Sequence, residues 1–170
     1  MIIYGIDPGP KESALVGVEF GEPVKITRCE ILPNGELLEL LRGIYYGGVT
    51  AIEWLSYYGP TTSAGSETFA TCFWVGRFFS VAGIARHPLL IERREVRLSL
   101  VGTPRAGDPE VRRALIERLG DKGTKKSPGP LHGITSHAWA ALAVAVCAHD
   151  HLLGVPGCAK VANGGVLCES

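Results

Sequence analysis

The amino-acid sequence predicts an α/β fold in which a mixed five-stranded sheet is flanked by helices. Short apolar runs of strand-like character occur five times, and segments with helical spacing of apolar residues follow the third, fourth and fifth of them. The chain has 170 residues, of which 46% are hydrophobic, and this is enough for one domain with a substantial core.

The first three strands are predicted to form an antiparallel meander. They cover residues 2–7, 14–20 and 23–32, and Gly21-Glu22 forms a hairpin turn between the second and the third. The first strand then lies centrally in the sheet, where it pairs with the fourth strand, residues 49–54.

The remaining elements are two helix–strand pairs followed by two helices. Asp108, Pro109 and Glu110 indicate a helix start, with Asp as the cap and Pro at the first helical position, and Gly120 indicates its end. A basic segment follows the fifth strand. The predicted order is helix 35–43, strand 49–54, helix 64–82, buried through Phe69, Trp74, Phe78 and Phe79, strand 89–92, helix 108–120 and helix 136–153.

Two carboxylates end predicted strands. Asp7 ends the first strand in the segment Gly5-Ile6-Asp7-Pro8-Gly9, and Glu53 comes near the end of the fourth. A carboxylate in a buried strand is disfavoured unless something compensates its charge, and a metal ion is the usual partner. The alternative for Asp7 is structural, because Asp before Pro-Gly also opens Asx-type turns.

Composition limits the class of protein. Seventeen basic and seventeen acidic residues give no net charge, so binding of a polyanion requires local clusters of Lys and Arg. Five cysteines without C-x-x-C spacing indicate a reduced, cytoplasmic protein with no disulfide and no zinc site.

The longest apolar run, around 138–148, is too short to span a bilayer. Residues 154–170, with Pro156 and four glycines, are expected to form a flexible tail beyond a domain of residues 1–153.

Several motifs in one order carry a resemblance to a known family. They are G-I-D-P-G at 5–9, A-I-E at 51–53, R-R-E-V-R at 93–97 leading to V-G at 101–102, V-R-R-A-L-I-E-R-L at 111–119, K-G-T-K-K-S-P-G-P at 122–130 and S-H-A-W-A-A-L-A-V-A-V at 136–146. With these motifs the chain resembles the RuvC-type Holliday junction resolvases of the ribonuclease H-like superfamily, especially their compact phage-borne branch.

The resemblance implies a homodimer that binds a four-way DNA junction and nicks two opposing strands with Mg²⁺ or Mn²⁺, at two ions per active site. It also implies roles in DNA recombination and repair, in the host cytoplasm if the protein is phage-encoded. Asp7 and Glu53 match metal ligands of the family, and two further site positions match 137 and 140 on the last helix. Their spacing puts both on one helix face.

The sequence departs from the family at one of these positions. Position 137 is His, as in some members, but position 140 is Ala where the best-known members carry Asp. Loss of an anionic ligand is expected to weaken metal binding and to slow cleavage by roughly two or more orders of magnitude. Ala140 is either an engineered inactivating change or native to a branch that needs no acid there. Glu67 and Asp150 are candidate substitutes, and a non-cleaving branched-DNA-binding module is the alternative function.

Basic residues near the expected site are candidates for DNA contact. The loop before the last helix carries three lysines and two hydroxyl groups, which suits phosphate binding, although a solvated loop has the same composition. Tyr57 and Tyr58 are candidates for base stacking, and the aromatic residues of helix 64–82 for the core or a dimer interface. The DNA-binding candidates are Lys122, Lys125, Lys126, Arg93, Arg94, Arg97, Arg77 and Lys11.

The first motif also occurs in a different group of proteins with a related fold. The actin and sugar-kinase group also begins with G-I-D but needs a much longer chain.

Overall fold

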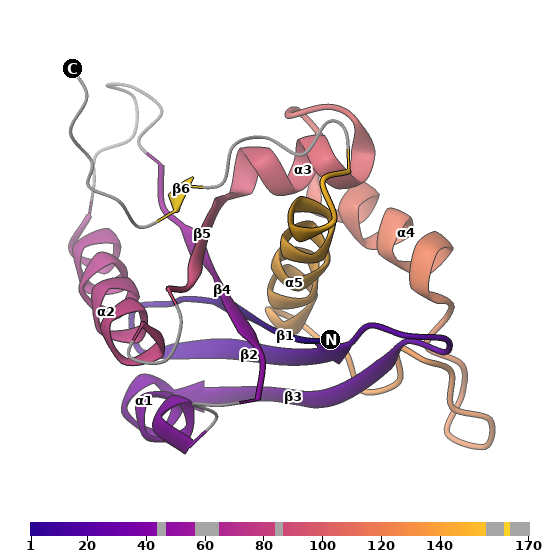
Figure 1. Cartoon of the computed structure of the whole chain (residues 1–170), viewed down its shortest axis with the longest axis horizontal. Helices are drawn as coiled ribbons and strands as arrows, with labels where there is room; N and C mark the ends of the chain where they lie inside the picture. The colour runs from indigo at the N-terminus through magenta and orange to yellow at the C-terminus, as the bar shows by residue number, and fades with distance from the viewer. Residues whose placement is uncertain (44–46, 57–64, 84–86, 156–161, 164–170) are drawn as a thin grey trace.

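A computed structural model describes residues 1–43, 47–56, 65–83, 87–155 and 162–163. Its helices and strands are shown in Figure 1. In chain order they are β1 (Ile2–Asp7), β2 (Glu12–Glu19), β3 (Lys25–Pro33), α1 (Asn34–Gly43), β4 (Val49–Trp54), α2 (Ser66–Ala82), β5 (Leu89–Glu92), α3 (Arg93–Val101), α4 (Asp108–Leu119), α5 (Ala138–Leu152) and β6 (Ala162–Asn163).

The strands form one mixed sheet in the order β3-β2-β1-β4-β5-β6. The first three strands are an antiparallel meander, β1 pairs with β4 in parallel, and β4 pairs with β5 in parallel. The predicted α/β class, the five strands and the central position of the Asp7 strand beside the Glu53 strand are therefore confirmed. The sequence analysis did not predict β6, whose two residues pair with the outer edge of β5 within the segment expected to be a tail.

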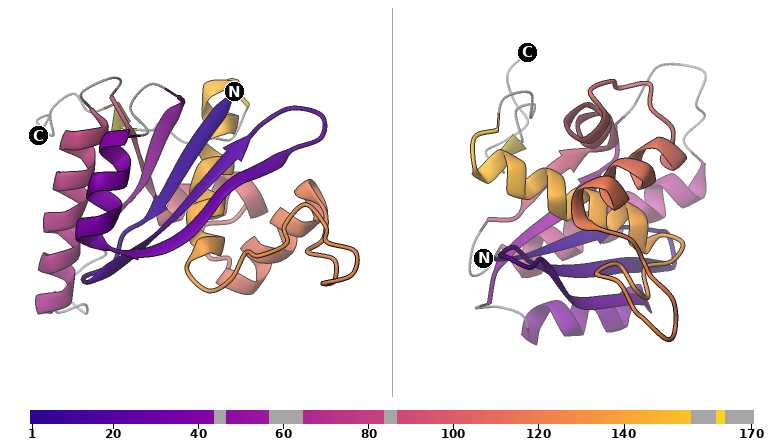
Figure 2. Two further views of the ribbon diagram at one scale, coloured as in Figure 1. Left: turned by 90° about the horizontal axis from the view of Figure 1, so that it is seen from below. Right: turned by 90° about the vertical axis from the view of Figure 1, so that its right-hand side faces the viewer.

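Helices cover both faces of the sheet, as the views in Figure 2 show. One buried cluster contains alternate residues of β1 and β2, such as Ile3 and Val16, packed against α3, α4 and α5. A second cluster contains the residues between them, such as Ile6 and Leu15, packed against α1 and α2. Both faces of β1 are apolar because both are covered, and this explains its unbroken apolar sequence.

The Ala-rich helix α5 lies unusually close to β1. A Cβ atom added to Gly5 would come within 2.0 Å of the carbonyl oxygen of Ala141 and 2.8 Å of the amide nitrogen of Ala145. Only a residue without a side chain fits at position 5, and only small residues fit on the facing side of the helix. This contact fixes the N-terminal end of α5 over the end of β1, where Asp7 lies.

Three sequence-based expectations need correction. The basic segment after β5 is helix α3, because Glu92 and Glu95 form a capping box at its start and Gly102 ends it in a left-handed conformation. Helix α4 begins at Asp108 itself, with Gly107 as its cap, so the Asp108 side chain is free for other contacts. Helix α2 is only partly buried, since Phe69 is 67% exposed while Phe78 is fully buried.

Within the described ranges, no helix is both long and apolar enough to cross a membrane. Most of the predicted flexible tail, residues 154–170, lies outside the described residues, and so do Tyr57 and Tyr58.

Candidate active site

Asp7 and Glu53 lie side by side at the carboxyl ends of β1 and β4. Ile6 pairs with Ile52 in the parallel register, so the next residue of each strand is a carboxylate. Their side chains are 12% and 8% exposed and line a cavity of about 990 Å³. Two strands that end in the same direction thus place two acidic groups at one edge of the sheet, as the sequence predicted.

The two carboxylates are electrostatically unfavourable as an isolated pair. Burial, reinforced by the negative charge of Asp7, raises the pKa of Glu53 to about 7. Burial also raises the pKa of Asp7, and the nearby His137 only partly offsets this effect. A cation between the two groups would stabilise the ionised form of both, so the pair fits a positively charged ligand.

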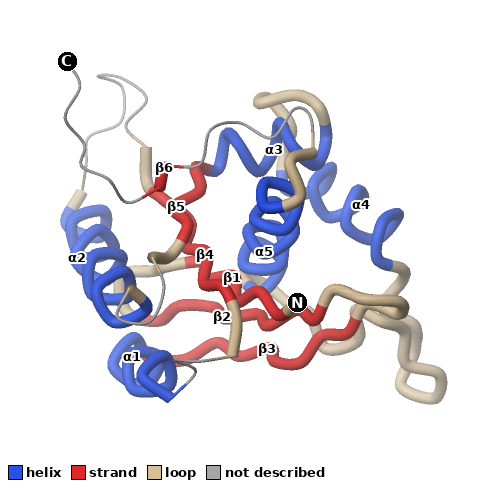
Figure 3. Tube along the Cα trace, viewed as in Figure 1, coloured by secondary structure: helices blue, strands red, loops and turns tan. Residues whose placement is uncertain are grey.

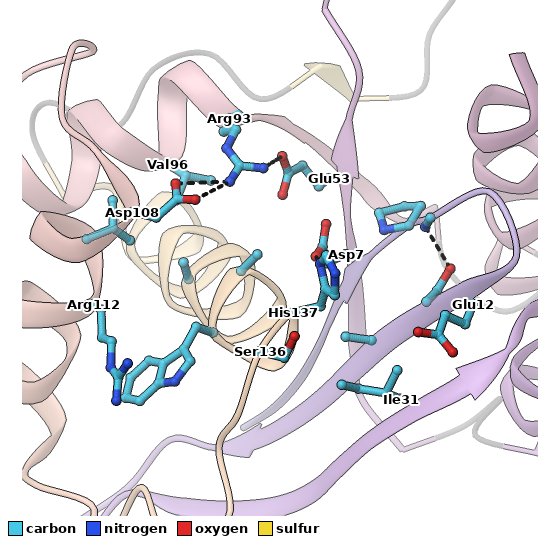
Figure 4. Close-up of a pocket in the computed structure, with 18 of the residues that line it drawn as sticks. Asp7, Glu12, Ile31, Glu53, Arg93, Val96, Asp108, Arg112, Ser136 and His137 are labelled. Atoms are coloured by element: carbon cyan, nitrogen blue, oxygen red, sulfur yellow. Dashed lines mark hydrogen bonds and ion pairs between the residues drawn. The ribbon is translucent and has the colours of Figure 1, made fainter. Parts of the chain in front are cut away.

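The last helix contributes His137 and Ala140 to the same cavity. His137 precedes the first residue of α5, and its Nδ1 lies 3.1 Å from Oδ2 of Asp7. Figure 4 shows both side chains at the cavity. Ala140 lies one turn further along and also lines the cavity. Positions 137 and 140 therefore both line the cavity, and the wall at position 140 is a methyl group.

The donor set fits Mg²⁺ or Mn²⁺ only in part. Both ions prefer oxygen ligands, which the paired carboxylates supply, and His137 offers a nitrogen at the open side. However, among the described residues no three His, Cys, Asp or Glu side chains are grouped closely enough to hold a metal ion. Asp7 and Glu53 could therefore hold an ion whose remaining ligands come from water or substrate.

An ion-pair network that the sequence analysis missed joins α3 and α4 to the carboxylates. Arg93 lies 3.3 Å from Oε1 of Glu53 and donates two hydrogen bonds of 3.0 Å to Asp108. Arg97 lies 3.6 Å from the same Asp108. The contact with Arg93 lowers the pKa of Asp108. In the sequence, Asp108 indicates the start of a helix, and nothing near it in the chain indicates its ion-pair partners.

The DNA-binding candidates occupy different places. Lys11, Arg93 and Arg97 line the cavity. Arg94 is exposed on α3, and Lys125 and Lys126 are exposed in the projecting loop before α5, where Gly123 pairs with Pro128 (Figure 3). Arg77 lies elsewhere, on α2, where its guanidinium stacks over Trp74 at 4.9 Å.

Arg112 and Trp139 are pocket residues without a sequence signal. The Arg112 guanidinium lies 4.6 Å from the centre of the Trp139 ring, and the Lys122 ammonium lies 5.8 Å from it. Arg112 and Trp139 both line the cavity. Cation–π contacts of this kind restrict long basic side chains, so two cations are held beside the wall formed by α5.

Neither proposed substitute carboxylate lies in the cavity. Asp150 is buried near the other end of α5, where it forms an ion pair with Arg118 of α4. Glu67 is exposed in the first turn of α2. Among the described acidic residues outside the strands, Asp108 is linked to Glu53 through their shared partner Arg93.

The architecture is the ribonuclease H-like fold, with an acidic pair at the ends of its two central parallel strands. Solved structures with this fold are similar over nearly the whole chain. Thermus thermophilus RuvC matches with a TM-score of 0.66 and 23% identity, over 95% of this chain and 99% of that chain. T. thermophilus RuvC in complex with a Holliday junction substrate matches with a TM-score of 0.69 and 20% identity, over the same shares.

A third solved structure is the yeast mitochondrial Holliday junction resolvase Ydc2, with a TM-score of 0.51 and 12% identity over 84% of this chain and 76% of that chain. No protein-family model matches the chain, and no curated protein sequence matches it. At these identities the comparisons confirm the fold expected from the resemblance to RuvC-type resolvases. The phage-borne branch stays a prediction.

Proposed function

We propose that the protein is a metal-dependent endonuclease that binds four-way DNA junctions as a homodimer and nicks opposing strands. The observation that carries the proposal is the largely buried Asp7–Glu53 pair, at the ends of adjacent parallel strands in a cavity of a RuvC-like fold. Hydrolysis of a phosphodiester requires an activated water and neutralisation of negative charge. Two desolvated carboxylates that favour a cation are the protein groups this chemistry needs.

Each side chain of the cavity has a role in this proposal. Asp7 and Glu53 would hold Mg²⁺ or Mn²⁺, and such an ion, when bound, would supply the means to activate water and to stabilise charge on the leaving oxygen. His137 touches Asp7 and is mostly exposed, so it can orient that carboxylate and accept a proton at the open side of the site. Arg97 and Lys11 line the cavity and bind the phosphates on either side of the reacting one.

We propose branched DNA as the substrate because of the shape of the expected DNA-binding surface and because of the similar solved structures. One of the similar structures is a complex with a Holliday junction substrate. The projecting loop of residues 122–130 carries Lys122, Lys125 and Lys126 and lies just before α5, which suits contact with a DNA arm. In a dimer with twofold symmetry, two such surfaces engage two arms only when the DNA is bent accordingly.

Two observations favour the alternative, a branched-DNA-binding module that does not cleave. Position 140 offers a methyl group to the cavity, and Glu53 is engaged by Arg93. With fewer free oxygen ligands the affinity for a divalent ion falls, while the basic surface that would bind DNA is unchanged.

Cleavage of a labelled synthetic four-way junction tests both candidates. The chain and its Ala140→Asp and Asp7→Asn variants are incubated with Mg²⁺ or Mn²⁺, and junction binding is measured in parallel without metal. Symmetric nicks by the chain or by Ala140→Asp, absent in Asp7→Asn, support the endonuclease. Junction binding by all three proteins without any metal-dependent product refutes it and supports the binding module.

A further inference from the structure

Arg93 occupies an electrostatically unfavourable position that only its partners explain. It is the first residue of α3, where the helix dipole is positive and a cation is normally disfavoured. Its side chain is nevertheless directed to the carboxylates, and it lies between Glu53 and Asp108 in Figure 4. The cost at the helix end is offset because the guanidinium contacts one carboxylate from β4 and one from α4.

The Arg93 guanidinium lies on the side of Glu53 that faces Asp108. It contacts Glu53 at 3.3 Å and both oxygens of Asp108 at 3.0 Å, and its charge also acts on Asp7. Arg93 therefore already neutralises one side of the acidic pair. Among the residues that the structure describes, Asp7 forms no ion pair with a Lys or Arg, and its partner is the exposed His137.

The charges of the network agree with a single added divalent ion. Asp7, Glu53 and Asp108 are the carboxylates, and Arg93 and Arg97 are the cations joined to them. One divalent ion and one DNA phosphate make this group neutral. A second divalent ion would leave an excess of two positive charges in a partly buried cavity, which is costly.

We infer that Arg93 supplies the second positive charge of this site, so that one divalent ion, held by Asp7 and Glu53, binds per chain. This inference rests on the proposed function and changes its expected stoichiometry of two ions. Arg93 acts as a positioning residue: it restrains the Glu53 carboxylate through their 3.3 Å contact in the free protein and repels additional cations. A neutral side chain at position 93 therefore makes the site more attractive to divalent cations.

Titration of the DNA-free protein with Mn²⁺ tests the inference, with free Mn²⁺ followed by electron paramagnetic resonance. The chain is expected to bind one ion that is lost in Asp7→Asn. Arg93→Gln and Arg93→Met are expected to bind Mn²⁺ about tenfold more tightly, because a unit charge near the site is removed. Arg93→Lys keeps the charge and is expected to bind like the unchanged chain.

Arg94→Gln is the matched control, because Arg94 is the next residue of α3, is exposed and does not line the cavity. Its Mn²⁺ affinity is expected to equal that of the unchanged chain. Circular dichroism melts verify that each variant is folded. If either Arg93→Gln or Arg93→Met fails to fold, the other neutral variant still tests the inference. A role of Arg93 limited to stabilising α3 would leave the Mn²⁺ affinity unchanged or lower it.

The outcomes separate this inference from the proposed function. Two Asp7-dependent ions in the unchanged chain, or neutral variants that bind no more tightly, overturn the inference even if junctions are cleaved. One ion with the expected tightening supports the inference even if cleavage fails. Absence of any Asp7-dependent Mn²⁺ binding overturns the inference and removes metal-dependent cleavage from the proposed function as well.

Discussion

Replacement of Glu53 by Gln is expected to stabilise the metal-free protein at alkaline pH. The pKa of Glu53 is raised from 4.5 to about 7 by burial and by Asp7. The folded state therefore holds this proton more tightly than the unfolded state, so stability falls as the pH rises from about 4.5 to 7. At about 1.4 kcal/mol per pKa unit, ionised Glu53 costs about 3 kcal/mol at pH 8.

The amide of the variant removes this cost and can still accept a hydrogen bond from Arg93. For a domain of this length, the gain corresponds to a rise in melting temperature of roughly 6–12 °C at pH 8 and to a much smaller rise at pH 5. Glu12→Gln is the control, because Glu12 also lines the cavity but is exposed.

The assay is thermal and urea unfolding in EDTA between pH 5 and 8. Parallel pH profiles for the unchanged chain and Glu53→Gln would refute the reasoning, because they would show that burial of Glu53 has no cost. Added Mn²⁺ is expected to raise the melting temperature of the unchanged chain and to have little effect on Glu53→Gln, since binding to the folded state alone is stabilising.

Three further predictions concern other parts of the molecule. Gly5→Ala is expected to destabilise the fold by more than about 3 kcal/mol in urea unfolding, because its Cβ would lie 2.0 Å from the Ala141 oxygen, whereas Gly76→Ala, with no atom within 4 Å, is expected to be neutral or slightly stabilising. Arg112→Gln is expected to weaken junction binding and to lower its salt dependence by about one unit, while Arg113→Gln, on the neighbouring exposed position, has a smaller effect. Asp7→Asn is expected to reduce any metal-dependent cleavage by at least about 100-fold in single-turnover assays while junction binding is retained.

The sequence contained enough information for strands β1 to β5 and for the placement of Asp7 beside Glu53. The apolar runs around Asp7 and Glu53 fixed two strands, and the ends of neighbouring parallel strands necessarily meet at one edge. The spacing of positions 137 and 140 fixed their common helix face, since helical geometry is local. These features depend on residues near one another in the chain or on a rule that holds for every parallel pair.

The tertiary structure alone decided which charges meet at the site. Arg93 and Asp108 are 15 residues apart, and their contact depends on how α3 and α4 pack against α5. Arg112 and Trp139 come together for the same reason, and Asp150 is directed away from the cavity to Arg118. Long basic side chains reach several alternative partners, so their pairing follows from the final packing of helices and cannot be inferred from sequence spacing.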